Sequence, residues 1–107
     1  MSTSKMKPNY QQFTQEVTTS KPYSNKELDG GLDSICQNLG LTILGKLVHQ
    51  FDPHGYTTIR ILSESHIVLH YWPEYNFVHL DLVCCKEGLT VEKFTKVINE
   101  IFYQNNS

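Results

Sequence analysis

The run LSESHIVLHYWPEY near the middle of the chain contains side chains that can cut a peptide bond and use the new end. Ser65 follows Glu64, His70 lies five residues after that serine, and Cys85 lies twenty residues after it. A serine hydroxyl can attack the preceding carbonyl, a histidine can carry protons, and a thiol can return a proton to a carbanion. This spacing predicts a chain that cuts itself before Ser65 and keeps the new end as a cofactor. The alternative is that the serines are ordinary residues of a hairpin turn.

A Phe-x-Pro-x-Gly turn precedes this run and reads Phe51-Asp52-Pro53-His54-Gly55. With this turn included, the stretch from Phe51 to Cys85 resembles the S-adenosylmethionine decarboxylase proenzymes, in particular their short bacterial and archaeal class. Those proteins carry a closely similar Ser-Glu-Ser-His…His…Trp-Pro-Glu run. The match is strong over this middle part of the chain and extends to residues 26–50 and 86–103 only in pattern.

The resemblance implies a role for each group of the cleavage site. Ser65 would attack the Glu64 carbonyl, and elimination would leave a dehydroalanine that hydrolyses to a covalent pyruvoyl group. His70 would take the serine α-proton during processing, and the Thr57 hydroxyl would assist the oxyanion step. The pyruvoyl carbonyl would then form a Schiff base with the substrate amine, and Cys85 would donate the proton that follows decarboxylation.

The resemblance also implies how the substrate is held. Glu74 matches the acid that holds ribose hydroxyls, and Phe51 matches the aromatic residue that stacks on adenine close to the sulfonium. Ile67 and Trp72 would line the pocket. The presence of both the acid and the stacking aromatic favours S-adenosylmethionine as substrate, so that the product would be the aminopropyl donor for polyamine (spermidine) synthesis.

Two residues depart from the family pattern and keep alternatives open. Tyr71 and Asn76 stand where a smaller residue and a glycine are expected. A pocket changed in this way would suit a pyruvoyl-dependent ornithine or arginine decarboxylase, in which a basic amino acid replaces the adenosyl substrate. A third reading is a non-catalytic homologue that regulates a paired subunit, although that reading predicts the loss of Ser65, His70 or Cys85.

Length and composition limit the possible partners. The 107 residues suffice for one domain, and so short a domain buries a modest fraction of its surface. A partner subunit is therefore expected, and the family implies a homodimer. The net charge of −2 argues against nucleic acid or an anionic membrane as the main partner.

The cysteines and the apolar residues indicate the compartment. Three cysteines, two of them adjacent, do not make a secreted disulfide framework, and no Cys-x-x-Cys pair suggests a metal site. No apolar stretch approaches the roughly 20 residues of a membrane span, and the N-terminus lacks the hydrophobic core of a signal peptide. We therefore expect a cytoplasmic protein without a metal.

Local patterns predict an α+β two-layer sandwich, with helices packed on one face of an antiparallel sheet. Residues 1–24 are polar and would form a flexible tail or a weak edge strand, and residues 25–107 would form the decarboxylase-like domain. Ser24 and Glu27 have the spacing of a capping box, and a helix should follow as far as Gly40. Strands are expected at 41–50, 57–62, 66–72 and 77–85, and a last helix at 90–103. Its apolar side would consist of Val91, Phe94, Ile98, Ile101 and Phe102.

Strand alternation predicts which face carries the chemistry. In 77–85 one set of alternate residues is apolar and should face the helices: Val78, Leu80, Leu82 and Cys84. His79 and Cys85 then point to the opposite face, where His66, His70 and Trp72 of the preceding strand should join them. Cys84, and Cys36 in the first helix, are expected to be buried filler.

Overall fold

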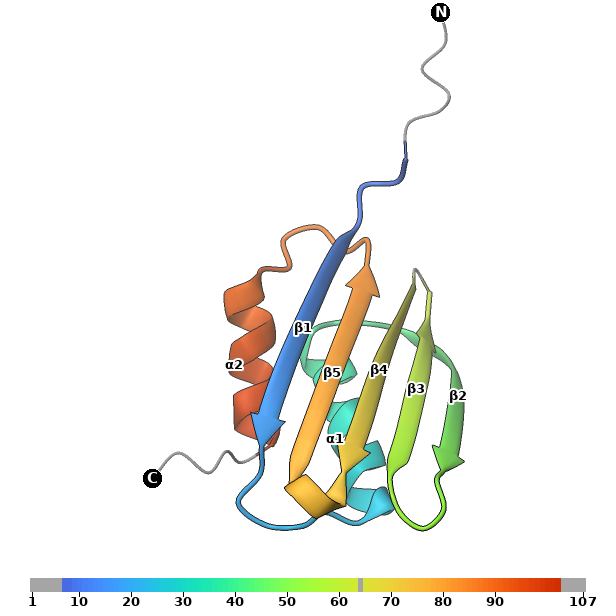
Figure 1. Ribbon diagram of the computed structural model, residues 1–107. Coiled ribbons are helices and arrows are strands. Elements are labelled where there is room, and N and C mark those ends of the chain that lie inside the picture. Colours follow the sequence, from blue (N-terminus) through green and yellow to red (C-terminus); the bar gives the residue numbers. More distant parts are fainter. Residues whose placement is uncertain (1–6, 64, 103–107) are drawn as a thin grey trace, which may run out of the picture.

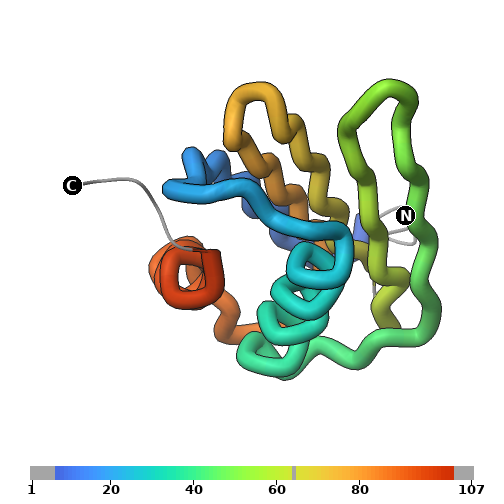
Figure 2. Tube along the Cα trace, turned by 90° about the horizontal axis from the view of Figure 1, so that it is seen from below, coloured from blue at the N-terminus to red at the C-terminus, as the bar shows by residue number. Residues whose placement is uncertain are grey.

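The computed structural model describes residues 7–63 and 65–102, which form one antiparallel sheet and two α-helices. The elements are β1 (Gln11–Thr18), α1 (Asn25–Asn38), β2 (Ile43–Gln50), β3 (Tyr56–Leu62), β4 (Ser65–Trp72), the 3₁₀ turn η1 (Pro73–Tyr75), β5 (Phe77–Cys84) and α2 (Val91–Ile101). The strand order is β1-β5-β4-β3-β2 (Figure 1). Both helices lie on the same side of the sheet, as Figure 2 shows from below. The predicted fold class is confirmed.

The polar N-terminal segment contributes the edge strand β1, which pairs with β5 along its whole length. Val17 is the one fully buried residue of this strand. Phe13 is half-buried and stacks on Phe94 of α2, with ring centroids 5.5 Å apart. Hydrogen bonds to β5 thus hold β1 in the sheet although it has few apolar side chains. The same polar composition is the reason why the sequence was also consistent with a flexible tail.

The helix α1 begins with the predicted capping box. Ser24 Oγ accepts a hydrogen bond from the Glu27 N–H (3.1 Å), and Glu27 Oε1 accepts one from the Ser24 N–H (2.8 Å). These bonds satisfy amide groups that have no partner inside the helix. Leu28, Leu32 and Ile35 recur on one side of α1 and are fully buried. The capping box and the apolar stripe together fix the start and the orientation of α1.

The two adjacent glycines of α1 have different surroundings. A Cβ on Gly31 would lie 2.7 Å from Cζ of Phe102 and 3.3 Å from Cγ2 of Ile101. A Cβ on Gly30 would meet nothing within 4 Å. Gly31 therefore lets α1 approach the end of α2 closely, whereas Gly30 only lowers the helix propensity.

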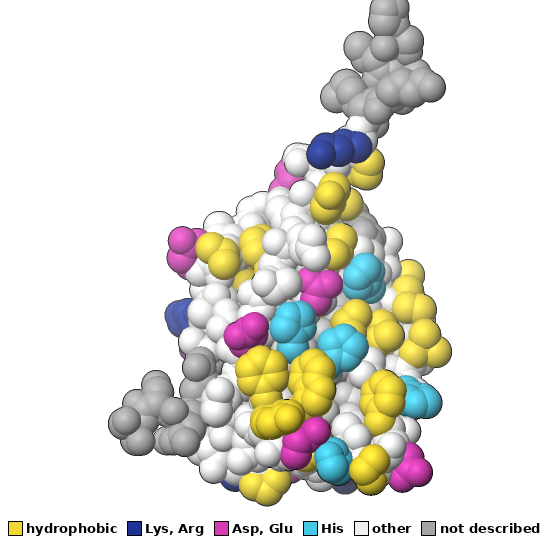
Figure 3. All heavy atoms as spheres, in the orientation of Figure 1, with side chains coloured by type: hydrophobic (Ala, Val, Ile, Leu, Met, Phe, Trp, Pro, Cys, Tyr) yellow, Lys and Arg dark blue, Asp and Glu magenta, His cyan; other side chains and the backbone are white. Residues whose placement is uncertain are grey.

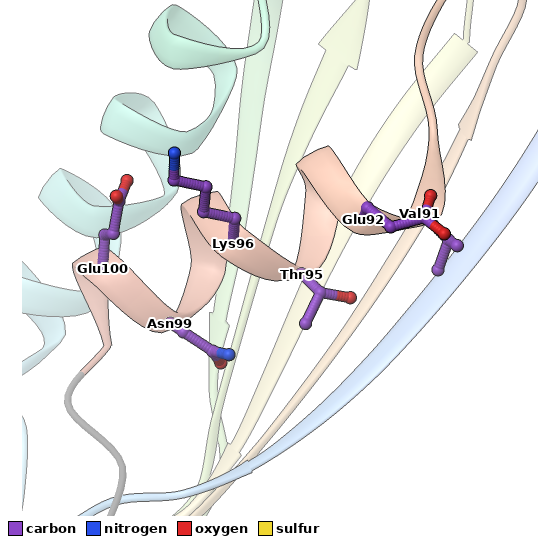
Figure 4. Close-up of a pocket in the computed structure, with 6 residues that line it drawn as sticks. All are labelled: Val91, Glu92, Thr95, Lys96, Asn99 and Glu100. Carbon is purple, nitrogen blue, oxygen red and sulfur yellow. The ribbon is translucent and has the colours of Figure 1, made fainter.

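The buried side of α2 differs from the prediction at two positions, Val91 and Val97. Phe94, Ile98 and Phe102 are buried, but Val91 is 50% exposed and Val97 is buried. The prediction for Val91 was wrong. Residues four apart lie on the same side of a helix, and Val91 shares the outer side of α2 with Thr95 and Asn99. These residues line a shallow hollow on α2 with their neighbours (Figure 4): Val91, Glu92, Thr95, Lys96, Asn99 and Glu100. None of the predicted site residues lines this hollow.

A buried arginine joins the sheet to α1, and sequence patterns did not predict it. Arg60 lies on the helix-facing side of β3 and is only 1% exposed. Its Nε donates to Asp33 Oδ1 at 2.7 Å, and its guanidinium forms an ion pair with Asp29 at 3.6 Å. It also donates to Thr58 Oγ1 at 2.8 Å. Burial acts to raise the pKa of Asp33, but the hydrogen bonds from Arg60 and Lys46 outweigh it and hold the pKa below its usual value.

The glycine pair gives a matched test of the contact between the helices. Gly31→Ala should destabilise the protein by about 1–3 kcal/mol, because the new methyl group overlaps the Phe102 ring. Gly30→Ala, which adds the same methyl group one residue earlier, should stabilise it by up to about 1 kcal/mol. Urea unfolding of both variants measures the difference. Equal effects would show that the close approach at Gly31 does not constrain the packing.

Candidate active site

The candidate site lies on the face of the sheet that the helices leave uncovered. In β4 and β5 the buried residues face the helices, and the partly exposed ones alternate with them, as predicted. We call the uncovered side the open face, and its side chains from β2 to β5 are Leu47, His49, Thr57, Ile59, Ile61, His66, Val68, His70, Trp72, Phe77, His79, Asp81 and Val83. Figure 3 shows this face, where histidine and hydrophobic side chains gather. Strand alternation therefore places imidazole and aromatic groups together.

A threonine and a histidine form a hydrogen-bonded pair on the open face. Thr57 of β3 and His70 of β4 are directly opposite each other in the register. Thr57 Oγ1 and His70 Nδ1 are 2.8 Å apart. The His70 ring also lies 6.3 Å from the His79 ring and 5.9 Å from Trp72. The register thus brings together the two residues that the resemblance assigns to proton transfer and oxyanion assistance.

His70 is poised to accept a proton at neutral pH. Burial lowers the pKa of His70 below its ordinary value of 6.5, and the nearby His79 lowers this pKa further, while Asp81 acts in the opposite direction. A lowered pKa means that the imidazole is neutral at pH 7 and takes up a proton, and with it a positive charge, only at more acidic pH. A neutral imidazole next to a hydroxyl group is an arrangement suited to general base chemistry.

The Thr57–His70 pair lines a pocket of about 340 Å³ at one end of the sheet. The pocket brings together five of the predicted site residues: Phe51, Thr57, His70, Trp72 and Glu74. It also contains residues that the prediction did not include: His54, Gly55, Tyr56 and Tyr71. Two aromatic side chains and one carboxylate beside a proton-transfer pair suit a ligand with a flat ring and hydroxyl groups.

The turn between β2 and β3 positions Phe51 at this pocket. The Phe51 N–H donates to the Gly55 carbonyl at 2.9 Å, and the Gln50 side-chain amide donates to the same oxygen at 2.9 Å. Gly55 has a φ of 114°, which residues with a Cβ rarely adopt. His49 contacts the Phe51 ring edge-on, with centroids 4.5 Å apart. The glycine of the Phe-x-Pro-x-Gly motif thus closes the turn that presents the aromatic ring.

Ser65 lies in a different part of the molecule from this pocket. It is the first residue of β4, half-buried, and lines a separate pocket of about 210 Å³ with Ser63, Cys84 and Lys86 among others. His70 is five residues further along the same extended strand. Strands rise about 3.3 Å per residue, so the two side chains are about 16 Å apart along β4. Glu64, the other side of the predicted cleavage bond, lies outside the described residues.

The remaining predicted residues have distinct positions. Cys85 follows β5 directly and is half-buried, whereas Cys84 is 2% exposed and lines the pocket of Ser65. Ile67 is fully buried on the helix-facing side of the sheet. Ile67 does not line the pocket of about 340 Å³, because it alternates along β4 with the open-face residues. Burial raises the pKa of the Cys36 thiol to about 11, which leaves it unreactive.

The described ranges, 7–63 and 65–102, contain no candidate metal centre and no candidate membrane span. They contain no cluster of three or more metal-ligating side chains. Neither α-helix in these ranges is long and apolar enough to cross a membrane. The open face and the Ser65 pocket are therefore the places where the described structure combines reactive side chains.

Comparisons with known proteins agree on one family. A family model described as S-adenosylmethionine decarboxylase matches residues 14–107. The S-adenosylmethionine decarboxylase proenzyme of Archaeoglobus fulgidus is 39% identical over 71 residues, which are 66% of this chain and 63% of that protein. The proenzyme of Clostridium botulinum (strain Loch Maree / Type A3) is 33% identical over 69 residues, 64% of this chain and 60% of that one. The chain thus covers less than two thirds of the length of these curated relatives.

A solved structure shares the fold. The crystal structure of the adenosylmethionine decarboxylase from Aquifex aeolicus VF5 superimposes with a TM-score of 0.78 at 20% sequence identity. The similarity covers 94% of this chain and 85% of that one. At this level of identity the likeness establishes that both chains fold alike.

Replacing His79 tests the electrostatic description of the open face. His79→Gln should raise the pKa of His70 toward its ordinary value, because it removes a neighbouring imidazole that can carry charge while burial remains. NMR titration of the His70 ring resonances measures the shift. His66→Gln, a change on the same strand as His70, is the control and should leave the titration unchanged. An unaltered His70 titration in His79→Gln would contradict the coupling.

Proposed function

Because this chain belongs to the S-adenosylmethionine decarboxylase family, we propose that it is a self-processing, pyruvoyl-dependent S-adenosylmethionine decarboxylase. The observation that supports this most is the pocket that unites Phe51, Trp72 and Glu74 with the Thr57–His70 pair. An aromatic ring pair suits adenine, and a carboxylate suits ribose hydroxyls. The product would serve as the aminopropyl donor in spermidine synthesis.

Processing would convert Ser65 into the cofactor in three steps. The Ser65 hydroxyl attacks the carbonyl of residue 64, and the C–N bond breaks as an ester forms. His70, with its lowered pKa, removes the α-proton of residue 65, so that the carboxylate of residue 64 leaves and a dehydroalanine remains. Water then converts this group to pyruvate with release of ammonia. The result is a β chain of residues 1–64 and an α chain of residues 65–107.

The surroundings of Ser65 fit a covalent group of this kind. Ser65 pairs with Leu62 of β3, and β4 is flanked by β5 on its other side. Pairing with β3 at Ser65 and with β5 from His66 onward would keep the start of β4 in place after the preceding bond is cut. The half-buried pocket of about 210 Å³ gives room at this end. A pyruvoyl group supplies an electron sink for a departing carboxylate, and Cys85 would return the proton.

The distance between Ser65 and His70 supports a homodimer with composite sites. At about 16 Å along one strand, the two side chains do not meet within one chain. In a two-fold symmetric dimer formed by the open faces, the rim of the sheet where β4 begins in one chain would lie beside the His70 end of the other. The open face also exposes apolar side chains that a second copy would cover: Leu47 at 58%, Ile61 at 44% and Trp72 at 39%.

The residues that departed from the family pattern do not favour another substrate. Tyr71 is buried on the helix side, and its hydroxyl accepts a hydrogen bond from the Tyr23 N–H at 3.1 Å. Asn76 adopts the left-handed conformation, with a φ of 49°, that a glycine would also adopt there. Neither change supplies the pocket with a group that would select ornithine or arginine. Cytoplasmic localisation is part of the proposal.

Intact mass of the denatured protein tests the processing reaction. The wild-type chain should separate into two fragments at the 64/65 bond, with pyruvate blocking the second one. Ser65→Ala should remain whole and inactive, and Ser63→Ala, the neighbouring serine, should still be cut. Borohydride trapping with S-adenosylmethionine, ornithine and arginine in one mixture should yield the adenosylmethionine adduct. Cleavage of Ser65→Ala at this bond, or an uncut wild-type chain, would contradict the proposal.

Complementation between two inactive variants tests the composite site. His70→Ala should not be cut when produced alone. When it is produced together with an equal amount of Ser65→Ala, a mixed dimer contains one site with both residues intact. About half of the His70→Ala chains should then be cut, because random pairing places half of them in mixed dimers. Absence of cleavage in the mixture would place the complete site within one chain.

A further inference from the structure

We propose that His54 is a positioning residue for the substrate, acting through Glu74. This inference rests on the proposed function, because it assigns the carboxylate of Glu74 to the ribose hydroxyls. His54 Nε2 lies 3.3 Å from Glu74 Oε1. Both residues line the pocket of about 340 Å³. Their side chains are 49% and 37% exposed, so both reach the pocket and neither is part of the core.

The contact joins two separate turns at the same end of the sheet. His54 belongs to the turn between β2 and β3, and Glu74 belongs to η1 between β4 and β5. Each turn is anchored by its own backbone hydrogen bonds. The first closes from the Phe51 N–H to the Gly55 carbonyl at 2.9 Å, and the second closes from the Asn76 N–H to the Pro73 carbonyl at 3.2 Å.

A further bond fixes η1 to the edge of the sheet. The Thr19 N–H donates to the Asn76 carbonyl at 2.8 Å. Because both turns are held independently, the His54–Glu74 contact is not needed to close either of them. Its main effect is on the direction of the Glu74 side chain.

The geometry leaves one carboxylate oxygen available. Glu74 Oε1 faces His54 Nε2, and among the described residues no hydrogen bond or ion pair occupies Oε2. The contact is an ion pair when the imidazole is protonated, and an imidazole Nε2–H is a hydrogen-bond donor in the neutral ring as well. Restraining one oxygen sets the rotamer of a half-exposed side chain, which otherwise samples several orientations. The second oxygen is then presented toward a ligand hydroxyl in the pocket.

The same pocket contains the groups that would bind the remainder of an adenosyl ligand. Phe51 precedes His54 in one turn, and Trp72 precedes Glu74 by two residues, so each aromatic ring comes from the same segment as one partner of the pair. The His54–Glu74 contact therefore orients the hydroxyl-binding carboxylate in the same pocket as the ring-stacking groups. This makes His54 a determinant of affinity for the ribose part of the substrate.

Two substitutions of His54 distinguish the effect of its contact with Glu74 from the effect of the volume of its side chain. His54→Leu removes the donor, and His54→Gln keeps a nitrogen donor at a similar reach. On the processed enzyme, His54→Leu should raise KM for S-adenosylmethionine by about threefold to fivefold, the range expected for a half-exposed charged contact, while kcat changes less than twofold. His54→Gln should restore most of the wild-type KM. Glu74→Gln should raise KM at least tenfold.

Ligand binding distinguishes positioning from a merely structural role. The probes are 5′-methylthioadenosine and its 2′,3′-dideoxy analogue, titrated calorimetrically into processed wild-type and His54→Leu protein. The variant should bind the first probe about threefold to fivefold more weakly and the second as wild type does. Tyr75→Leu, the next residue after Glu74 and 71% exposed, is the matched control and should affect neither.

The outcomes are separable from the test of the proposed function. Three outcomes would overturn the role of His54 and leave the proposed decarboxylase activity standing. His54→Leu could weaken the binding of both probes equally, it could weaken the binding of neither, or His54→Gln could have a KM as high as that of His54→Leu. A wild-type chain that is not cut between residues 64 and 65 would overturn both. The extent of self-cleavage, read by intact mass, also confirms that each variant is folded before its KM is compared.

Discussion

The ion pairs of Arg60 with two aspartates of α1 are the interaction on which the rest of the structure depends. Its guanidinium is removed from water, so its charge requires the nearby carboxylates of Asp29 and Asp33. The Tyr56 hydroxyl donates to Asp29 at 2.9 Å, so a second residue of β3 is tied to the same helix. These contacts decide which side of β3 faces α1. Thr57, one residue from Tyr56, must then face away from the helices and toward His70.

Much of the fold could be predicted because its signals are local. The capping box at Ser24 and the alternation of β5 each involve residues a few positions apart, and both are found as expected. Arg60 has no such signal. An arginine in a strand ordinarily indicates that its side of the sheet faces solvent. The partners of Arg60 lie in α1, far from β3 in the sequence. Only the assembled structure shows that α1 brings two carboxylates over this strand.

The candidate site was predicted in part, and its shortfalls have geometric causes. Resemblance identified the residues of the aromatic pocket, and the strand register brings them together. Ser65 and His70 are close in sequence, but an extended strand separates residues that a helix or turn would bring near. Ile67 was assigned to the pocket although alternation with His66 already placed it on the other face. His54 was part of the quoted turn, yet its partner lies in another loop and no spacing rule connects the two.

The strand order has a consequence for the proposed cleavage between residues 64 and 65. Fragment 65–107 would contain β4 and β5, which occupy the middle of the sheet. Fragment 1–64 would contain β1 on one side of that pair and β3 and β2 on the other. Fragment 65–107 would therefore lie between two strands of fragment 1–64. Its β5 would pair with β1 and its β4 with β3. Loss of that one covalent link would leave the two pieces interleaved, and their dissociation would require breaking the strand pairing on both sides at once.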